Sequence, residues 1–250
     1  MLDSLKLESW NENGFLLLEN LFTKEEVNAL VSCVDDIAVL EPSPGKWMQY
    51  HETSLLDNQQ ILGRVECFLE YHKGIEYFLL HETLMTTISE IIGGPAILFK
   101  EKINFKLPGA NGYPPHQDAP AWRDFPPGYF ISAFVAVDAC DISNGCMQMY
   151  PRRGILELSG EINIPQEEWI SIKMKPGDVL FFDCFVVHKS EPNLSDYPRR
   201  ALLNTYNRRV DGDFRTSYFE NKRKFFPPMN ERLSNVDYAN NPYNHFNPFK

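Results

Sequence analysis

The spacing of apolar residues changes along the chain, and its first part follows the patterns of one strand and one helix. Residues 10–19 carry the apolar run FLLL and are typical of a strand. Thr23 and Glu26 form a capping-box signature, and apolar residues recur after them at helical spacing as far as Ala38. The first unit is therefore predicted to be a strand followed by an amphipathic helix.

A loop and a second helix are predicted before the pattern changes. Residues 41–60 are polar and rich in turn-forming residues. Residues 75–92 have helical spacing and end at Gly93-Gly94-Pro95, a strong helix terminator. Beyond this point short apolar runs are separated by Pro, Gly, Asn and Asp, and they predict strands over residues 97–107, 129–137, 146–150, 169–174, 179–187 and 201–208.

This order of elements predicts a mainly β fold with flanking helices. Helices that precede a series of strands, without alternating with them, argue against a parallel sheet. We expect a double-stranded β-helix core, the jelly-roll architecture of cupin-like proteins, with the N-terminal helices packed outside it. We expect one domain over residues 1–250, made of a helical part (1–95), a jelly-roll core (96–210) and a C-terminal arm (211–250), and the sequence leaves open whether the arm is ordered.

Composition and charge narrow the class of partners. The formal net charge is −10, because 34 acidic residues outnumber 24 basic ones, and this disfavours nucleic acid and anionic membranes as partners. No apolar run approaches the roughly 20 residues that span a bilayer, and the N-terminus lacks a signal-peptide pattern. The five cysteines are scattered without a C-x-x-C pair, so neither a disulfide framework nor a zinc site is expected. These features predict a cytoplasmic protein that binds a small molecule, and they leave its oligomeric state open.

Two histidines and one carboxylate provide the candidate chemistry. His116 and Asp118 are two positions apart, and residues at this spacing in a strand point to the same side of the sheet. A second histidine from another strand, His188, would complete a two-histidine, one-carboxylate facial triad. Such a triad holds non-heme Fe(II) and leaves adjacent coordination positions open for a co-substrate and oxygen. The three residues therefore predict an oxygen-activating enzyme.

A single histidine in a strand is more often a structural residue, so the context of each histidine matters. His116 follows the loop 112–115 at the entrance of a predicted strand, and His188 closes the apolar run over residues 179–187. Both positions suit ligands at the mouth of a barrel. No histidine of the chain belongs to an H-E-x-x-H motif, which excludes a zincin.

Several motifs follow one another over residues 98–208, namely HQD at 116–118 with Trp122, NGCM at 144–147, KPGDVLFF at 175–182, His188, NLS at 193–195 and RRA at 199–201. In their types and order these motifs resemble the phytanoyl-CoA dioxygenase-like family of Fe(II)- and 2-oxoglutarate-dependent oxygenases. One departure is the turn PRRG at 151–154, where many relatives have PGSH. That histidine is not an iron ligand in this interpretation, so the departure does not affect the predicted metal site. Arg152 and Arg153 are either contacts to an anionic substrate or solvated surface arginines.

The resemblance implies the identity of the metal and of its ligands. It makes His116, Asp118 and His188 the ligands of Fe(II), with 2-oxoglutarate and O2 as co-substrates and no catalytic residue beyond the metal ligands. Arg199 would hold the distal carboxylate of 2-oxoglutarate, because a planar guanidinium pairs with a carboxylate through two hydrogen bonds. Arg200 is the alternative, since neighbouring residues of a strand face opposite ways.

Polar and aromatic residues near the motifs are candidates for further contacts. By the resemblance, Lys102 and Asn104 are expected to contact 2-oxoglutarate or the substrate, and the alternative is that they form the polar outer face of a half-buried strand. Substrate contacts are expected of Tyr113, Gln117, Trp122 and Arg123. For the aromatic residues the alternative is packing in the barrel core, and Gln117 would point away from both of its neighbours in a regular strand.

The resemblance implies hydroxylation of a substrate that the sequence does not identify. A small polar metabolite is favoured over a coenzyme A thioester, because that large polyanion does not suit an acidic protein. One candidate is 2-aminoethylphosphonate or a related organophosphonate, and another is an amino-acid derivative or a natural-product intermediate. The basic groups available to a phosphonate are Lys100, Lys102, Lys106, Arg123 and Arg152. Two further alternatives are a cupin-like metal enzyme that does not use 2-oxoglutarate, and a non-catalytic binding module, against which the intact triad argues.

Overall fold

Two antiparallel sheets form the centre of the computed structural model, which describes residues 2–126, 128–151 and 162–238. The larger sheet has seven strands in the order β1 (Phe15–Leu18), β9 (Val179–Asp183), β6 (Ile131–Ala136), β11 (Arg199–Arg208), β4 (Ala96–Lys106), β3 (Gln60–Glu66) and β2 (Met48–Thr53). The smaller sheet has four strands in the order β5 (Tyr113–His116), β10 (His188–Ser190), β7 (Met147–Met149) and β8 (Ile170–Ile172).

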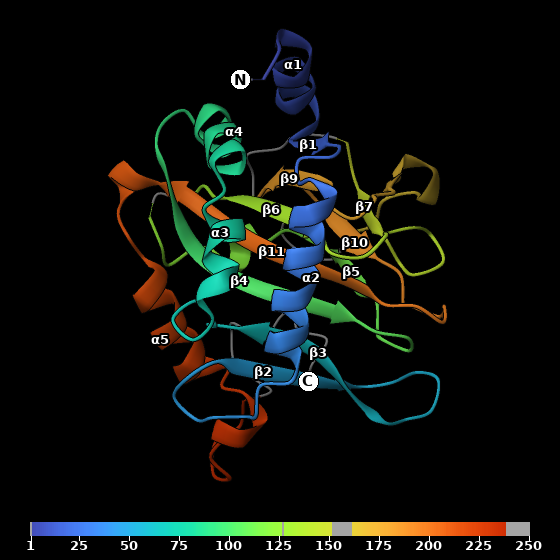
Figure 1. The fold of residues 1–250 in the computed structure, drawn as a ribbon, viewed down its shortest axis with the longest axis vertical. Helices are drawn as coiled ribbons and strands as arrows, with labels where there is room; N and C mark the ends of the chain where they lie inside the picture. The colour runs from blue at the N-terminus through green and yellow to red at the C-terminus, as the bar shows by residue number, and fades with distance from the viewer. Residues whose placement is uncertain (1, 127, 152–161, 239–250) are drawn as a thin grey trace.

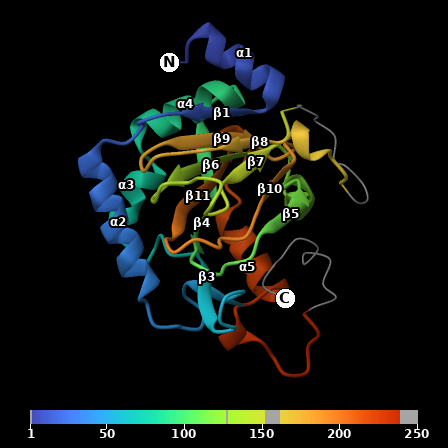
Figure 2. The ribbon, with the colours of Figure 1, turned by 90° about the vertical axis from the view of Figure 1, so that its right-hand side faces the viewer.

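Helices lie mainly over the outer face of the larger sheet, and the smaller sheet lies on its other side (Figure 1; Figure 2). The α-helices are α1 (Ser4–Asn13), α2 (Lys24–Ala38), α3 (Glu76–Leu79), α4 (Glu82–Ile92) and α5 (Arg215–Phe225). Short 3-10 helices are η1 (Lys73–Ile75), η2 (Ala119–Trp122), η3 (Gln166–Glu168), η4 (Arg209–Asp211) and η5 (Met229–Glu231). Helices α2, α3 and α4 share one hydrophobic core with the outer face of the sheet.

The helix α2 forms as its sequence predicts. The Thr23 side chain accepts a hydrogen bond from the Glu26 backbone N–H at 3.2 Å, and the Glu26 carboxylate accepts one from the Thr23 N–H at 2.7 Å. A cap of this kind contributes about 1 kcal/mol. Leu30, Val34 and Ile37 then follow one another along one side of the helix and are fully buried in the core. Local capping and helical spacing together therefore specify this element.

Successive side chains of strand β4 point alternately to the two faces of the larger sheet. Ile103 and Phe105 face the helices and belong to their core. The even-numbered residues from Lys100 to Lys106 lie on the opposite side, toward the smaller sheet. The polar side of β4 is thus enclosed between the two sheets and is not a solvated outer face.

The N-terminal region differs from the prediction in three places. Helix α1 includes Trp10, which was assigned to a strand, because the Asp3 side chain caps the helix by accepting from the Lys6 N–H at 2.9 Å. Residues 41–60, predicted as a loop, contain β2, whose backbone pairs with β3. The helix predicted over residues 75–92 is divided into α3 and α4. The region therefore contributes strands β1 to β3 to the larger sheet as well as helices outside it.

The strand predicted over residues 179–187 is shorter than expected. Strand β9 ends at Asp183, whose carboxylate accepts hydrogen bonds from the backbone N–H groups of Phe185 (2.9 Å) and Val186 (3.1 Å). The chain turns there, and His188 begins β10 in the smaller sheet. His188 therefore starts a new strand and does not end the buried one.

The C-terminal segment contains a helix that the sequence did not predict. Helix α5 packs against β4 and buries Tyr218 and Phe219. Its Arg215 pairs with the fully buried Glu101 of β4. Residues 239–250 of the proposed arm lie outside the described residues. No helix in the described part of the chain is both long and apolar enough to span a membrane.

Candidate functional site

The three predicted metal ligands meet beside the smaller sheet, which carries the two histidines. His116 and His188 are register partners on β5 and β10, and their ring centroids lie 4.2 Å apart. One ligand atom from each of His116, Asp118 and His188 lies within 4.8 Å of the others. Within the described ranges no other group of His, Cys, Asp and Glu side chains converges in this way.

Asp118 reaches this position differently from the prediction, because it is not part of a strand. Strand β5 ends at His116, and Asp118 is the N-cap residue of η2 with helical backbone angles (φ −77°, ψ −30°). The bend is held by two hydrogen bonds to the turn after β9: Gln117 Nε2 donates to the Phe185 carbonyl at 2.6 Å, and the Ala119 N–H donates to the Cys184 carbonyl at 2.9 Å. Gln117 thus orients the loop that carries the ligands.

Both imidazoles are oriented by their Nδ1 atoms. His116 Nδ1 lies 2.8 Å from the Pro114 carbonyl, and His188 Nδ1 lies 3.0 Å from the Val186 carbonyl. A carbonyl only accepts, so Nδ1 carries the proton and the lone pair of Nε2 is available to a metal. Burial lowers the pKa of His116 to about 3 and also lowers the pKa of His188, so both rings are neutral at physiological pH.

Asp118 supplies the negative charge of the group. Burial alone would raise its pKa, but His188, Lys100 and Lys102 outweigh this effect, and the pKa is lowered. The Fe(II) facial triad consists of two neutral imidazole nitrogens and one carboxylate oxygen. Here these three atoms converge on one place. The residues present therefore fit a non-heme iron that keeps open positions for co-substrate and oxygen.

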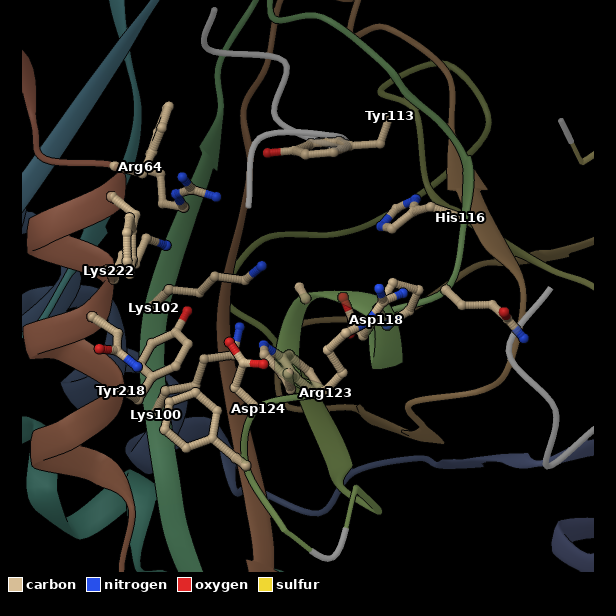
Figure 3. Close-up of a pocket in the computed structure, with 18 residues that line it drawn as sticks. Arg64, Lys100, Lys102, Tyr113, His116, Asp118, Arg123, Asp124, Tyr218 and Lys222 are labelled. Carbon is tan, nitrogen blue, oxygen red and sulfur yellow. The ribbon is translucent and has the colours of Figure 1, made fainter. Parts of the chain in front are cut away.

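A cavity of about 400 Å³ opens beside these ligands (Figure 3). His116 and Asp118 lie on one side of it, and the opposite side is formed by Arg64, Lys100, Lys102, Tyr218 and Lys222. Lys102 extends from β4 across the cavity toward the ligands. The cavity is therefore bounded by a metal-binding group on one wall and by cations on the other.

Two of these cations share one buried carboxylate. Glu66 is fully buried, lies 2.7 Å from Arg64 Nε and accepts hydrogen bonds from Lys222 Nζ at 2.7 and 2.6 Å. Burial works against ionisation of Glu66, yet the charges of Arg64 and Lys222 lower its pKa to about 2. This network joins β3 to α5 and fixes one wall of the cavity.

The other two cations have no acidic partner in an ion pair within the described part of the chain. Lys100 Nζ lies over the Trp122 ring, 4.6 Å from its centroid, and burial lowers its pKa. Burial, followed by the charge of Lys100, lowers the pKa of Lys102 to about 7. Asp118 and Glu66 offset these two charges only in part, so an anion that binds between the lysines would lower the cost of enclosing them.

The remaining predicted residues occupy different places. Trp122 is buried beneath Lys100, and Tyr113 lines the cavity, where burial raises its pKa to about 12. Arg123 is exposed at the rim, and Gln117 lines the cavity while bonded to the backbone. Arg152 and Arg153 lie outside the described residues.

Arg199 and Arg200 face opposite sides of β11. Arg200 donates to Asp138 (2.8 and 2.9 Å) and also pairs with Asp35 of α2, on the outer side of the sheet. Arg199 faces inward and is 1% exposed, and its Nε and Nη1 have no hydrogen-bond partner in the described part of the chain. The inward side of the neighbouring strand carries Asn104. The two orphaned guanidinium N–H groups fit a carboxylate such as that of 2-oxoglutarate.

Sequence reasoning missed Arg64, Tyr218 and Lys222. They come from β3 and α5, outside residues 98–208, and they approach the ligands only because β3 pairs with β4 and α5 packs against β4. The single local signal was the basic run near the end of α5, whose last turn contains Lys222, Arg223 and Lys224. A run of this kind is also typical of a solvated helix end.

Comparisons with known proteins find a matching family and similar enzymes. The model of a family described as phytanoyl-CoA dioxygenase (PhyH) matches residues 10–201. The chain is 40% identical over 251 residues to a 2-aminoethylphosphonate dioxygenase from an uncultured bacterium (HF130_AEPn_1), with 96% of each chain covered. It is 36% identical over 229 residues to a methylphosphonate hydroxylase from Gimesia maris, covering 88% of this chain and 86% of that relative.

A solved structure supports the fold alone. EctD from S. alaskensis, crystallised with 2-oxoglutarate and 5-hydroxyectoine, has a TM-score of 0.70 at 16% identity, and the match covers 84% of this chain and 77% of that chain. The predicted fold class, a β core with flanking helices, is confirmed by this similarity and by the two sheets.

Proposed function

This chain belongs to the phytanoyl-CoA dioxygenase family and is an Fe(II)- and 2-oxoglutarate-dependent dioxygenase, and from that premise we propose that it hydroxylates a small organophosphonate. The first candidate is 2-aminoethylphosphonate, on which the 40% identical relative acts by its name. The second is methylphosphonate, after the relative from Gimesia maris.

The proposal depends on one observation, the two neighbouring ammonium groups of the buried Lys100 and the half-buried Lys102. They face the candidate iron ligands across the cavity and form no ion pair with a carboxylate in the described part of the chain, and the charges of Asp118 and Glu66 offset them only from a distance. A phosphonate has three oxygens and carries up to two negative charges, so it would compensate both cations through charge-assisted hydrogen bonds. Arg64 and Lys222 add further positive charge, which Glu66 partly offsets.

Each residue then has a role in positioning. His116, Asp118 and His188 would hold the iron, and Arg199 would hold the distal carboxylate of 2-oxoglutarate. Bound iron with 2-oxoglutarate and O2 supplies the oxidising power that converts a substrate C–H bond into C–OH. Lys100 and Lys102 would anchor the phosphonate so that its carbon chain points toward the iron, and Trp122 and Phe125 would exclude water from the anchor.

The test is a substrate panel with matched charges. Anaerobically loaded Fe(II) enzyme is mixed with 2-oxoglutarate and air in the presence of 2-aminoethylphosphonate, methylphosphonate, β-alanine or ectoine. Succinate is measured, and phosphorus NMR identifies a hydroxylated phosphonate. We expect succinate with the phosphonates and little with β-alanine, the carboxylate analogue of 2-aminoethylphosphonate. Preferential turnover of ectoine or β-alanine would contradict the proposal.

Variants of the cationic wall test the assignment of the anchor. Lys100→Met and Lys102→Met are each expected to raise KM for the phosphonate by about 10- to 100-fold, because a charge-assisted hydrogen bond to a buried anion is lost. The Kd of 2-oxoglutarate should change little. Lys173→Met, which removes an exposed lysine near the smaller sheet, is the control. If Lys102→Met weakens binding of the phosphonate and of 2-oxoglutarate equally, Lys102 would be assigned to the 2-oxoglutarate site instead.

We also propose a cytoplasmic location. All five cysteines are free thiols, and a reducing compartment keeps thiols and Fe(II) reduced. Cell fractionation with an antibody tests this, and recovery from an oxidising compartment would contradict it.

A further inference from the structure

Tyr218 differs from the other buried tyrosines in the bonding of its hydroxyl. The Tyr50 hydroxyl donates to the Phe226 carbonyl at 2.8 Å, and the Tyr206 hydroxyl donates to the Leu79 carbonyl at 2.6 Å. Tyr218 is only 8% exposed, and its hydroxyl forms no hydrogen bond within the described part of the chain. Buried polar groups nearly always have a partner, so this hydroxyl requires an explanation.

The Tyr218 hydroxyl faces the cavity beside the candidate iron ligands. Tyr218 lines this cavity from α5, and Figure 3 shows its hydroxyl pointing toward Lys102. Nζ of Lys100 lies 5.7 Å from the centroid of the Tyr218 ring. The hydroxyl therefore belongs to the same wall of the cavity as the two lysines to which we assign the phosphonate.

Packing and ion pairs fix the position of this hydroxyl. The Tyr218 ring packs against Phe99 and Phe125, with centroid distances of 4.8 and 6.0 Å. Helix α5 is held to the larger sheet on both sides of Tyr218, because Arg215 and Lys222 form ion pairs with buried glutamates of β4 and β3. A side chain held in this way loses little conformational freedom when a ligand binds to it.

The hydroxyl can donate a hydrogen bond to an anion. Burial raises the pKa of Tyr218 well above its usual value, so the hydroxyl keeps its proton. Lys100 and Lys102 are donors as well, so β4 and α5 together present three donors to the cavity. A phosphonate has three oxygens on a tetrahedral phosphorus, whereas a carboxylate has two oxygens in one plane. Three donors therefore match a phosphonate and leave one donor unpaired beside a carboxylate.

We propose that the Tyr218 hydroxyl is the third ligand of the substrate phosphonate, beside Lys100 and Lys102. The inference rests on the proposed function and names a further positioning residue for it. Helix α5 lies beyond residue 201, at which the match to the family model ends. Tyr218 thus acts from outside the part of the chain that the family model describes, and its role is separate from metal and 2-oxoglutarate binding.

The binding test removes only the hydroxyl. Fe(II)-loaded protein with 2-oxoglutarate and without oxygen is titrated by calorimetry with methylphosphonate and with 2-aminoethylphosphonate. Tyr218→Phe should weaken binding of both by about tenfold or more, because a hydrogen bond to a charged acceptor is lost. Tyr71→Phe, at an exposed position, is the matched control and should change neither affinity.

Two outcomes of these titrations would overturn the proposal. One is an unchanged affinity of Tyr218→Phe for both phosphonates. The other is a loss confined to 2-aminoethylphosphonate, because it would place the hydroxyl at the ammonium group of the substrate. β-Alanine, which has a carboxylate in place of the phosphonate, should bind weakly to the unmodified protein and change little in Tyr218→Phe. Equal losses for β-alanine and for the phosphonates would also contradict the proposal.

Melting temperatures without substrate separate a binding role from a structural one. Tyr218→Phe should leave the melting temperature unchanged, because the hydroxyl has no partner to lose in the described part of the chain. Tyr50→Phe removes a hydroxyl that is bonded to the Phe226 carbonyl, and it should lower the melting temperature by roughly 2–4 °C. A lower melting temperature of Tyr218→Phe with unchanged phosphonate affinity would make its hydroxyl structural and overturn the inference.

The same titrations distinguish failure of this inference from failure of the proposed function. If the unmodified protein binds neither phosphonate, the proposed function fails and this inference fails with it. If the unmodified protein binds and hydroxylates a phosphonate and Tyr218→Phe does so equally well, only this inference fails.

Discussion

His116 and His188 are direct register partners on neighbouring strands, and their ring centroids lie 4.2 Å apart. Each Nδ1 is bound to a backbone carbonyl two residues earlier in the chain, so the local backbone orients both rings. The separation of the two nitrogen ligands is therefore set by backbone pairing, while Asp118 is added from the start of η2.

Removal of one imidazole should abolish metal binding. His188→Ala is expected to lose stoichiometric Fe(II) and the visible band that forms on addition of 2-oxoglutarate, because two donors hold the ion much less firmly than three. Iron content per protein and anaerobic spectra check this. His51→Ala, which changes an exposed histidine, is the control. A band that survives in His188→Ala would disprove the ligand assignment.

The two adjacent arginines should have separable roles. Arg199→Met is expected to weaken 2-oxoglutarate binding by at least about tenfold, with little loss of stability, because its charge has no acidic partner in the described structure. Arg200→Met should keep the affinity and lower the free energy of unfolding by about 1 kcal/mol, since it removes partly exposed ion pairs with Asp138 and Asp35. Anaerobic titration and urea unfolding measure the two effects. The opposite pattern would assign the clamp to Arg200.

Glu66 should be needed for stability as well as for the shape of the cavity. Glu66→Gln leaves Arg64 and Lys222 without their buried counter-charge, and we expect a loss of about 3–5 kcal/mol in the free energy of unfolding. Chemical denaturation at neutral pH is the measurement, and Glu41→Gln, at an exposed position, is the control. A loss no larger than that of the control would show that the network is screened by solvent.

The lowered pKa of Glu66 predicts that the protein is less stable in acid. The pKa of Glu66 is lowered from 4.5 to about 2 in the folded protein. Its contribution to the free energy of unfolding is therefore fully present above a pH of about 4.5 and is lost as the pH falls from 4.5 to about 2. Unfolding free energies measured from neutral pH downward should therefore decrease below a pH of about 4.5. The decrease should be shallower in Glu66→Gln. Parallel curves for the two proteins would assign the acid sensitivity to other carboxylates.

Local sequence predicted the elements whose signals are local. The capping box of Thr23 and Glu26 identifies the start of α2, and the alternation in β4 identifies a strand. Strand β2 was missed because its residues are largely polar and its stability comes from pairing with β3. Helix α5 was missed because it buries few apolar residues and is held by ion pairs such as Arg215 with Glu101.

The candidate site also combines residues that local sequence identifies with residues that only the fold brings together. The spacing of His116 and Asp118 and their family-like context were sufficient to propose a metal, although the strand geometry assumed for Asp118 was wrong. The proposal of Arg199 in preference to Arg200 rests on the ion pair of Arg200 with Asp138, which is far away in sequence. No spacing rule leads to the ion pairs of Glu66.

By itself the sequence determined which chemistry is available: imidazole and carboxylate groups for iron, an arginine for a carboxylate, and the helices and strands that carry them. These properties belong to residue types and to spacings within a few positions. Only the tertiary structure decided which charges are compensated. Glu66 partly offsets Arg64 and Lys222, whereas the buried Lys100 and Lys106 and the half-buried Lys102 have no acidic ion-pair partner in the described structure. The physical reason is that the energy of a charge depends on its burial and on neighbours that strand pairing brings from distant parts of the chain.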